Sequence, residues 1–197
     1  MQLYVTLSSP YARMARVLII EKGFEERIAV TPVKTRAPDA PYYAINPSGR
    51  VPSLVTDKGE LFEESALICA YLDALADPLV LAPATGWPAR RREAQARSML
   101  DGLAVWGREL SYRSTSEQSP TIVAHETARA RRMAALFDTI AASGALDGPL
   151  DMAQLTLGCA LHRRQDRFDW RPANANLAAW VDKFGERESM RRTLPPQ

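Results

Sequence analysis

Pro52 is the feature that most constrains how the first part of this chain folds. It stands directly before the short apolar run Ser53–Val55 and follows the segment 46–51, which reads NPSGRV. Proline has no N–H to give to a sheet ladder, so it belongs at the first residue of a strand, at an edge or at a bulge. Two interpretations follow: Pro52 ends an ordinary turn, or it shapes the chain so that one backbone edge beside the strand stays open.

Composition indicates a globular protein and argues against nucleic acid as the main ligand. The chain has 197 residues, enough for one large domain or two small ones, with 46% hydrophobic and 24% charged residues. The formal net charge is +2 and no lysine-rich run occurs, so binding a phosphate backbone is not the expected task. Arginines cluster on the predicted helices of the second half, and we interpret these faces as solvated surface.

Targeting signals and metal-binding patterns are not found in the sequence. No apolar stretch approaches the roughly 20 residues of a membrane helix, and the first residues lack a basic leader, so a cytoplasmic protein without a membrane segment is expected. Cys69 and Cys159 lie in apolar surroundings and form no CxxC, which fits buried thiols in a reducing compartment. His125 and His162 are far apart, so no metal site is predicted.

The first 75 residues read as mixed strand and helix. A β-branched and aromatic run at 2–7 predicts a strand, and a helix follows with Ser9 as N-cap, Pro10 as first helical residue and Gly23 at its end. Residues 26–33 predict a second strand, parallel to the first because a helix joins them. Strands at 53–56 and 60–62 form a hairpin whose turn uses Gly59, and a helix at 63–75 completes a β-α-β, β-β-α order.

The remainder of the chain reads as helical. The segment 76–88 holds three prolines and a glycine, which is typical of a linker. Amphipathic helices are predicted at 89–110, 121–143 and 174–187, and the apolar segment 150–162 predicts a helix at the centre of a bundle, started by an Asp151–Gln154 capping box. The tail 191–197 is expected to be loosely ordered. We predict a domain at 1–76, a linker at 77–87 and a helical domain at 88–197.

Three motifs in this order resemble the cytosolic glutathione S-transferase family. They are SSPYARMARVLI after the first strand, NPSGRVPSLV before the third strand and FEESALICAYL at the start of the helix predicted at 63–75. The resemblance is closest to bacterial members that begin with Ser-Pro-aromatic, and in the second half it covers only the general layout. It implies a thioredoxin-like α/β domain (β-α-β-β-β-α, with a cis proline) followed by an all-α domain.

The resemblance also implies a glutathione site along the first domain. A cis bond between Val51 and Pro52 would expose the Val51 N–H and C=O to the cysteinyl part of glutathione, as in strand addition. The alternative is a trans turn. Ser65 at a helix start would hold the γ-glutamyl carboxylate with Glu64 near the amino group, unless Ser65 or Glu63 serves only as a helix cap.

Two adjacent serines are candidates for the catalytic hydroxyl. A thiol has a pKa of about 8.5, so only a few per cent of glutathione is thiolate at neutral pH. A serine that donates a hydrogen bond to sulfur at a helix N-terminus would stabilise the thiolate. Ser9 is the first choice and Ser8 the second, and plain helix capping by Ser9 is the alternative.

Further residues are assigned from the layout of the family alone. Arg50 would reach the glycine carboxylate of glutathione, or is simply an exposed turn residue. Tyr11, Trp106 and Tyr112, with Arg108 as a further candidate, would border the pocket for the electrophile, although core packing is the better interpretation for Trp106.

These assignments predict a cytoplasmic, homodimeric glutathione transferase of the detoxification type. It would use glutathione as co-substrate, need no metal, and conjugate a small hydrophobic electrophile. Two alternatives stay open. One is another glutathione-dependent enzyme on this fold (an isomerase, dehalogenase or peroxidase), and the other is a non-catalytic adaptor that binds a protein partner.

Overall fold

The computed structural model describes residues 1–162 and 169–196, which form two compact units. The first unit comprises Met1–Ala82 together with the C-terminal residues from Arg187 onward, and the second is Pro83–Glu186. The sequence-based boundaries at residues 76 and 88 stay a prediction. Within the described residues, no helix combines the length and the apolar character needed to cross a membrane.

The first unit is built on a four-stranded sheet in the order β2-β1-β3-β4. The strands are β1 (Gln2–Val5), β2 (Ala29–Pro32), β3 (Ser53–Val55) and β4 (Leu61–Glu63). β1 pairs parallel with β2 and antiparallel with β3, and β3 pairs antiparallel with β4. The parallel pair and the hairpin are those predicted from the sequence, and Gly59 takes the positive φ of 78° that its hairpin turn requires.

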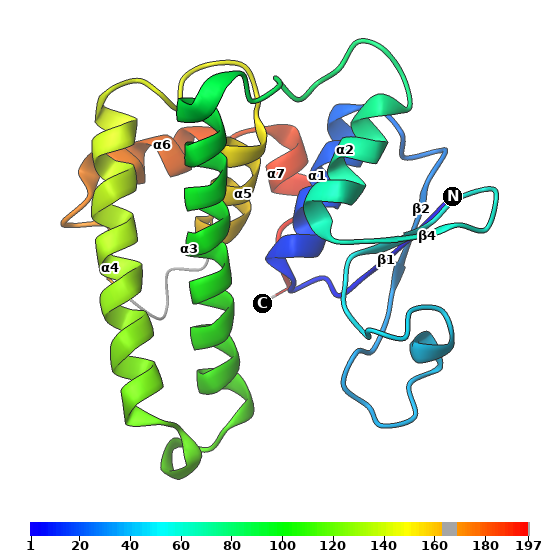
Figure 1. Ribbon diagram of the computed structural model, residues 1–197, viewed down its shortest axis with the longest axis horizontal. Coiled ribbons are helices and arrows are strands. Elements are labelled where there is room, and N and C mark those ends of the chain that lie inside the picture. The colour runs from blue at the N-terminus through cyan, green and yellow to red at the C-terminus, as the bar shows by residue number, and fades with distance from the viewer. Residues whose placement is uncertain (163–168, 197) are drawn as a thin grey trace. The chain divides into compact units, whose positions relative to one another are not determined.

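Helices α1 (Pro10–Glu21) and α2 (Ser65–Ala74) pack side by side in this unit (Figure 1). The N-cap of α1 is Ser9, Pro10 is its first residue, and Gly23 has a φ of 64° just after its end, as predicted. The core between helices and sheet is apolar: Leu3, Leu54 and Ile68 are fully buried. A short 3₁₀ helix, η1 (Pro41–Ala44), precedes the segment with Pro52.

The second unit is helical. Its elements are α3 (Gly86–Tyr112), η2 (Thr115–Glu117), α4 (Pro120–Ala142), α5 (Met152–Leu161) and α6 (Ala175–Gly185). Every residue of α5 after the first is buried, which confirms the predicted central helix, and both halves of the Asp151–Gln154 capping box are present at 2.8 and 2.9 Å. With the α/β unit before it, this helical unit completes the predicted fold class.

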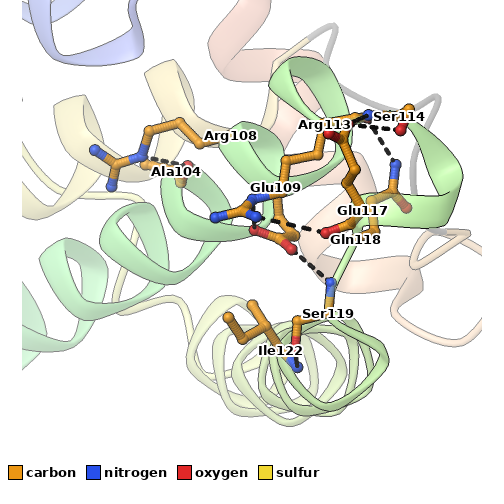
Figure 2. A network of polar contacts seen from close by, with 9 residues as sticks. All are labelled: Ala104, Arg108, Glu109, Arg113, Ser114, Glu117, Gln118, Ser119 and Ile122. Atoms are coloured by element: carbon orange, nitrogen blue, oxygen red, sulfur yellow. Dashed lines mark hydrogen bonds and ion pairs between the residues drawn. The ribbon is translucent and has the colours of Figure 1, made fainter.

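The turn between α3 and α4 is held by the buried carboxylate of Glu109 (Figure 2). Glu109 accepts a hydrogen bond from the Ser119 N–H at 2.7 Å and pairs with Arg113 at 3.1 Å. Arg108, five residues before Arg113, donates from Nε to the Ala104 carbonyl at 3.2 Å. The C-terminal end of α3 is thus fixed by its own polar contacts.

The C-terminal tail departs from the sequence-based expectation of loose order. Arg191 and Arg192 end the short helix α7 (Glu188–Arg192), and Thr193 is buried. The reason is Arg13 on α1, a buried cation that needs acceptors. Its guanidinium donates to the Met190 carbonyl at 2.7 Å and to Thr193 Oγ1 at 3.2 Å, so the tail provides acceptors for a charge in the core of the first unit.

A second buried ion pair fastens the chain after α2. Lys22 and Asp73 lie 3.3 Å apart with side chains 3% and 6% exposed. Lys22 also donates to the carbonyls of Asp73, Ala76 and Pro78, and the Asp73 carboxylate accepts from the N–H groups of Val80 and Leu81. We call Lys22, Asp73 and the segment 76–81 the linker clamp. The first half of the predicted linker is therefore a fixed part of the first unit.

Candidate functional site

One row of paired residues brings the predicted site segments to the same end of the sheet. Tyr4 of β1 pairs with Ser53 of β3, and Ser53 pairs with Glu63 of β4. β1 runs on from Tyr4 toward the two serines, β3 starts just after Pro52, and β4 ends at Glu63 just before Glu64. Ser8 and Ser9, the segment 50–52 and the pair Glu64–Ser65 therefore all leave the sheet at one end.

The bond between Val51 and Pro52 is cis, which confirms that prediction and excludes the trans turn. Val51 is half-buried, and among the described residues no hydrogen bond uses its N–H or its C=O. Buried backbone groups nearly always have a partner in a folded protein, whereas half-buried Val51 can present both groups to a ligand. An open donor and acceptor on one residue form a place where an extended peptide can add as a strand.

Two buried side chains hold the carbonyl directly before Val51. The Tyr42 hydroxyl donates to the Arg50 carbonyl at 2.5 Å, and the Asn46 side-chain amide donates to the same oxygen at 3.1 Å. The Tyr42 oxygen also lies 2.8 Å from the Ser53 hydroxyl. Tyr42, Asn46 and Ser53 are 3%, 1% and 0% exposed. We call these three residues the Arg50 carbonyl cradle.

The turn that carries Arg50 depends on a glycine and a serine. Gly49 has a φ of 65°, and a Cβ there would lie 2.7 Å from the Tyr43 ring, so only glycine fits. The Ser48 hydroxyl accepts from the Arg50 N–H at 3.2 Å and donates to Glu63 at 2.5 Å. Both backbone groups of Arg50 are thus fixed, while its side chain is exposed.

Glu64 caps α2, which neither sequence-based alternative predicted. Ser65 is the first residue of the helix, as expected, and it is buried. The carboxylate of Glu64 accepts from the Ala66 N–H at 3.1 Å and from the Ser65 hydroxyl at 3.3 Å. Glu63 instead binds Ser48. Glu64 has a φ of 78°, which costs an L-residue about 1–2 kcal/mol, and such strain is often found at functional positions.

Ser9 caps α1 through its hydroxyl oxygen, which leaves the hydroxyl able to donate a hydrogen bond. Its Oγ accepts from the Ala12 N–H at 3.2 Å, and within the described part of the chain no acceptor is recorded for its hydroxyl hydrogen. Capping uses the oxygen as an acceptor, whereas thiolate stabilisation uses the hydrogen as a donor, so the two roles are compatible. Ser8 is exposed and Ser9 half-buried.

The residues assigned to an electrophile pocket lie in different units. Tyr11, the second residue of α1, is half-buried in the first unit. Trp106 is 4% exposed on the packed face of α3, which supports core packing, and Tyr112 at the end of α3 is 62% exposed. A pocket formed by all three stays a prediction.

Sequence reasoning missed the Arg50 carbonyl cradle. Tyr42, Asn46 and Ser53 are spread over η1, a turn and β3, and their types are common in exposed turns. A weak signal was present, because Tyr42 and Asn46 are four residues apart and Asn46 begins the NPSG turn. Nothing in the sequence shows that both side chains point inward to one carbonyl.

Comparison with known proteins shows which family has a similar first domain. Residues 8–75, which contain every site segment of the first unit, match the family described as glutathione S-transferase, N-terminal domain. The first unit thus resembles the N-terminal domain of glutathione transferases, and the similar solved structures are glutathione transferase family members. The match does not test the Ser-Pro-aromatic subgroup, which stays a prediction.

Similar proteins align with this chain from end to end. The GST-like protein YibF of Escherichia coli K12, whose function is uncharacterised, is 28% identical over 205 residues and fully covered on both sides. A glutathione transferase family member from Pseudomonas fluorescens Pf-5 was crystallised with glutathione (29% identity, TM-score 0.88, coverage 100% and 99%) and with S-(propanoic acid)-glutathione (28%, 0.86, 100% of both chains). Among the described residues no cluster of three or more His, Cys, Asp or Glu side chains could hold a metal ion.

Proposed function

We propose that this protein binds glutathione along the row described above and conjugates the glutathione thiolate to a small hydrophobic electrophile. The observation that carries the proposal is the open N–H and C=O of Val51. The two helix caps at the same end of the sheet are Ser9, whose hydroxyl can donate, and Glu64, which has a positive φ. The glutathione-bound structures of a full-length relative support the same ligand class.

The proposed binding mode uses backbone groups for affinity and helix starts for charge. The cysteinyl N–H and C=O of glutathione pair with Val51 C=O and N–H, next to Pro52. The γ-glutamyl carboxylate lies at the start of α2 against Ser65, with Glu64 turned toward the ligand's amino group. The Glu64 carboxylate accepts from the Ala66 N–H, and in this binding mode it accepts from the ligand's amino group as well. The exposed Arg50 is the partner for the glycine carboxylate.

The proposed chemistry is nucleophilic substitution or addition by the thiolate. The hydroxyl of Ser9, with Ser8 as second candidate, donates a hydrogen bond to the sulfur and so lowers the pKa of the bound thiol. The bound thiol releases its proton to solvent, and a sulfur lone pair then forms the new C–S bond. In a substitution the leaving group takes the electrons of the bond that breaks, and in an addition the carbon that gains the electron pair takes up a proton from solvent. The protein forms no covalent intermediate and supplies position and charge stabilisation. Tyr11, Trp106 and Tyr112 are the proposed border of the electrophile pocket.

A homodimer in the cytoplasm is part of the same proposal. Leu67 on α2 is 52% exposed, and we propose that a second copy of the chain covers it. Light scattering on purified protein checks the dimer, and Leu67→Glu is expected to shift it toward monomer.

The test is retention on immobilised glutathione combined with conjugation of a general aryl halide. Binding with turnover supports the transferase, and activity on an isomerase, dehalogenase or peroxidase substrate instead would select another enzyme of this fold. Binding without any turnover would favour an adaptor. Failure of both binding and turnover contradicts the proposal.

A further inference from the structure

We propose that Tyr42 and Asn46 are positioning residues that aim the Val51 N–H at the ligand. The inference rests on the proposed function, because it takes Val51 as the strand-addition partner of glutathione. It assigns a task to the Arg50 carbonyl cradle, which lies behind the site and does not include any residue proposed to touch the ligand.

The cradle acts on one peptide unit. Arg50 C=O and Val51 N–H belong to the same planar group, and this bond is not among the cis bonds of the described chain. In a trans peptide the C=O and N–H vectors point in opposite directions. Fixing the carbonyl inward with hydrogen bonds at 2.5 and 3.1 Å therefore turns the Val51 N–H outward.

The donors of the cradle satisfy the Arg50 carbonyl completely. Tyr42 has one hydroxyl hydrogen, which goes to Arg50, so Ser53 must donate its own hydrogen to the Tyr42 oxygen. The Asn46 amide nitrogen gives its second hydrogen to the same Tyr42 oxygen at 3.4 Å, and Asn46 Oδ1 accepts from the Ser48 N–H at 3.1 Å. Two donors thus fill the two lone pairs of the Arg50 carbonyl, inside a nearly dry environment.

Closing the turn does not require this cluster. The turn has its own backbone bond, from the Gly49 N–H to the Asn46 carbonyl at 2.9 Å, and its own glycine at positive φ. Burying three polar side chains around one further carbonyl is costly unless each is satisfied, and a satisfied network gives rigidity. Rigidity at this point benefits the next group in the chain, which is the open N–H of Val51.

The experiment compares Tyr42→Phe with Tyr43→Phe. Tyr42→Phe removes only the hydroxyl and keeps the ring that packs on Tyr4, with centroids 5.8 Å apart. Tyr43→Phe is the matched control, because the neighbouring hydroxyl also bonds to a backbone carbonyl, that of Thr35 at 2.9 Å, but not to Arg50. The glutathione Kd is measured by calorimetry, and the Val51 amide resonance is followed by ¹⁵N NMR with and without saturating glutathione.

We expect Tyr42→Phe to weaken glutathione binding about tenfold, the loss of roughly one hydrogen bond's orienting effect. The shift of the Val51 amide proton on ligand binding should shrink in this variant. Tyr43→Phe should stay within twofold of the wild type with an unchanged Val51 shift. Asn46→Ala, which removes the other donor, should act in the same direction as Tyr42→Phe. The Val51 readout separates aiming from a general loss of stability, which thermal unfolding reports independently.

Equal Kd values and equal Val51 shifts in the wild type, Tyr42→Phe and Asn46→Ala would overturn the inference while leaving glutathione binding intact. A wild-type protein that does not bind glutathione would overturn the proposed function first, and this inference with it. The two failures are therefore distinguished by the wild-type measurement alone.

Discussion

The segments around Pro78 and Pro52, both in the first unit, differ in whether their backbone N–H and C=O groups have hydrogen-bond partners within the protein. Around Pro78, the linker clamp gives partners to three carbonyls through Lys22 and to two N–H groups through Asp73. Around Pro52, the cradle gives hydrogen bonds to the Arg50 carbonyl only. Among the described residues, the N–H and C=O of Val51 therefore have no partner. Both prolines follow cis bonds, so the bond type does not distinguish the segments.

This difference shows that a structural segment and a binding segment can be told apart by whether their backbone groups already have partners. A segment whose polar groups are all satisfied by the protein has nothing to offer a ligand, whereas a rigid segment with one unsatisfied edge has already met the ordering cost of strand addition. Substitutions in the linker clamp should therefore reduce stability with little effect on ligand affinity. Substitutions at the open site should act mainly on ligand binding or turnover, with a smaller cost in stability.

The largest expected effect is on stability, from Asp73→Ala. It leaves Lys22 as a buried charge without its carboxylate and frees the N–H groups of Val80 and Leu81. We expect the free energy of unfolding to fall by about 3–5 kcal/mol in urea titrations, with the glutathione Kd of the folded protein unchanged. Asp57→Ala, which breaks an exposed pair with the N-terminus, is the control and should cost less than about 1 kcal/mol. A comparable loss in both variants would contradict the contrast.

Ser9→Ala tests the open site through the thiol. Losing a hydrogen bond to a charged sulfur should lower turnover about 10- to 100-fold and raise the pKa of bound glutathione, with a much smaller change in Kd. The thiolate absorbance of the complex as a function of pH measures the pKa directly. A cost of about 1 kcal/mol in stability is also expected, because Ser9 caps α1. If Ser8→Ala alone produces these changes, the catalytic assignment moves to Ser8.

Glu64 allows stability and binding to be separated at one residue. Glu64→Gly and Glu64→Ala both remove the carboxylate, so each should weaken glutathione binding about tenfold. Glycine accepts the φ of 78° while alanine does not, so the glycine variant should unfold with a free energy about 1 kcal/mol above that of the alanine variant. Unfolding titrations and calorimetry on both proteins check this, and equal stability would mean that the positive φ costs nothing.

The smallest expected effect is a pH dependence at the contact between α1 and the C-terminal segment. Burial acts to raise the pKa of Glu21, but hydrogen bonds from Arg187 and Ser189, with the Arg187 charge, hold the pKa below its usual value. A carboxylate with a lowered folded pKa stabilises the protein above its unfolded pKa, and the stabilisation is lost as pH falls through the folded value.

Stability should therefore decline between about pH 5 and about pH 3, and Glu21→Gln should flatten this decline by less than about 1 kcal/mol. Urea titrations at several pH values measure it. Glu188→Gln, at a side chain 78% exposed in the same segment, is the control and should leave the decline unchanged. If the free energy of unfolding declines equally at acid pH in the wild type and in Glu21→Gln, this contact is not a source of the pH dependence.

The sequence by itself determined the elements that depend on local chemistry. Pro10 after Ser9 marks the start of α1, Gly59 marks the hairpin, and Asp151 with Gln154 marks the start of α5, because capping and turn formation involve residues a few positions apart. The apolar segment around α5 likewise indicated a fully buried helix. The order of these elements was sufficient to predict the two-part fold.

Only the tertiary structure decided which groups are occupied and which are open. That Glu64 caps α2, that Arg13 holds the tail through Thr193, and that Tyr42 and Asn46 meet at one carbonyl all depend on side chains brought together from distant or irregular segments. A sequence lists donors and acceptors but does not pair them, because pairing requires directions and distances that exist only after the chain has packed. The open edge at Val51 is what remains when that pairing is complete.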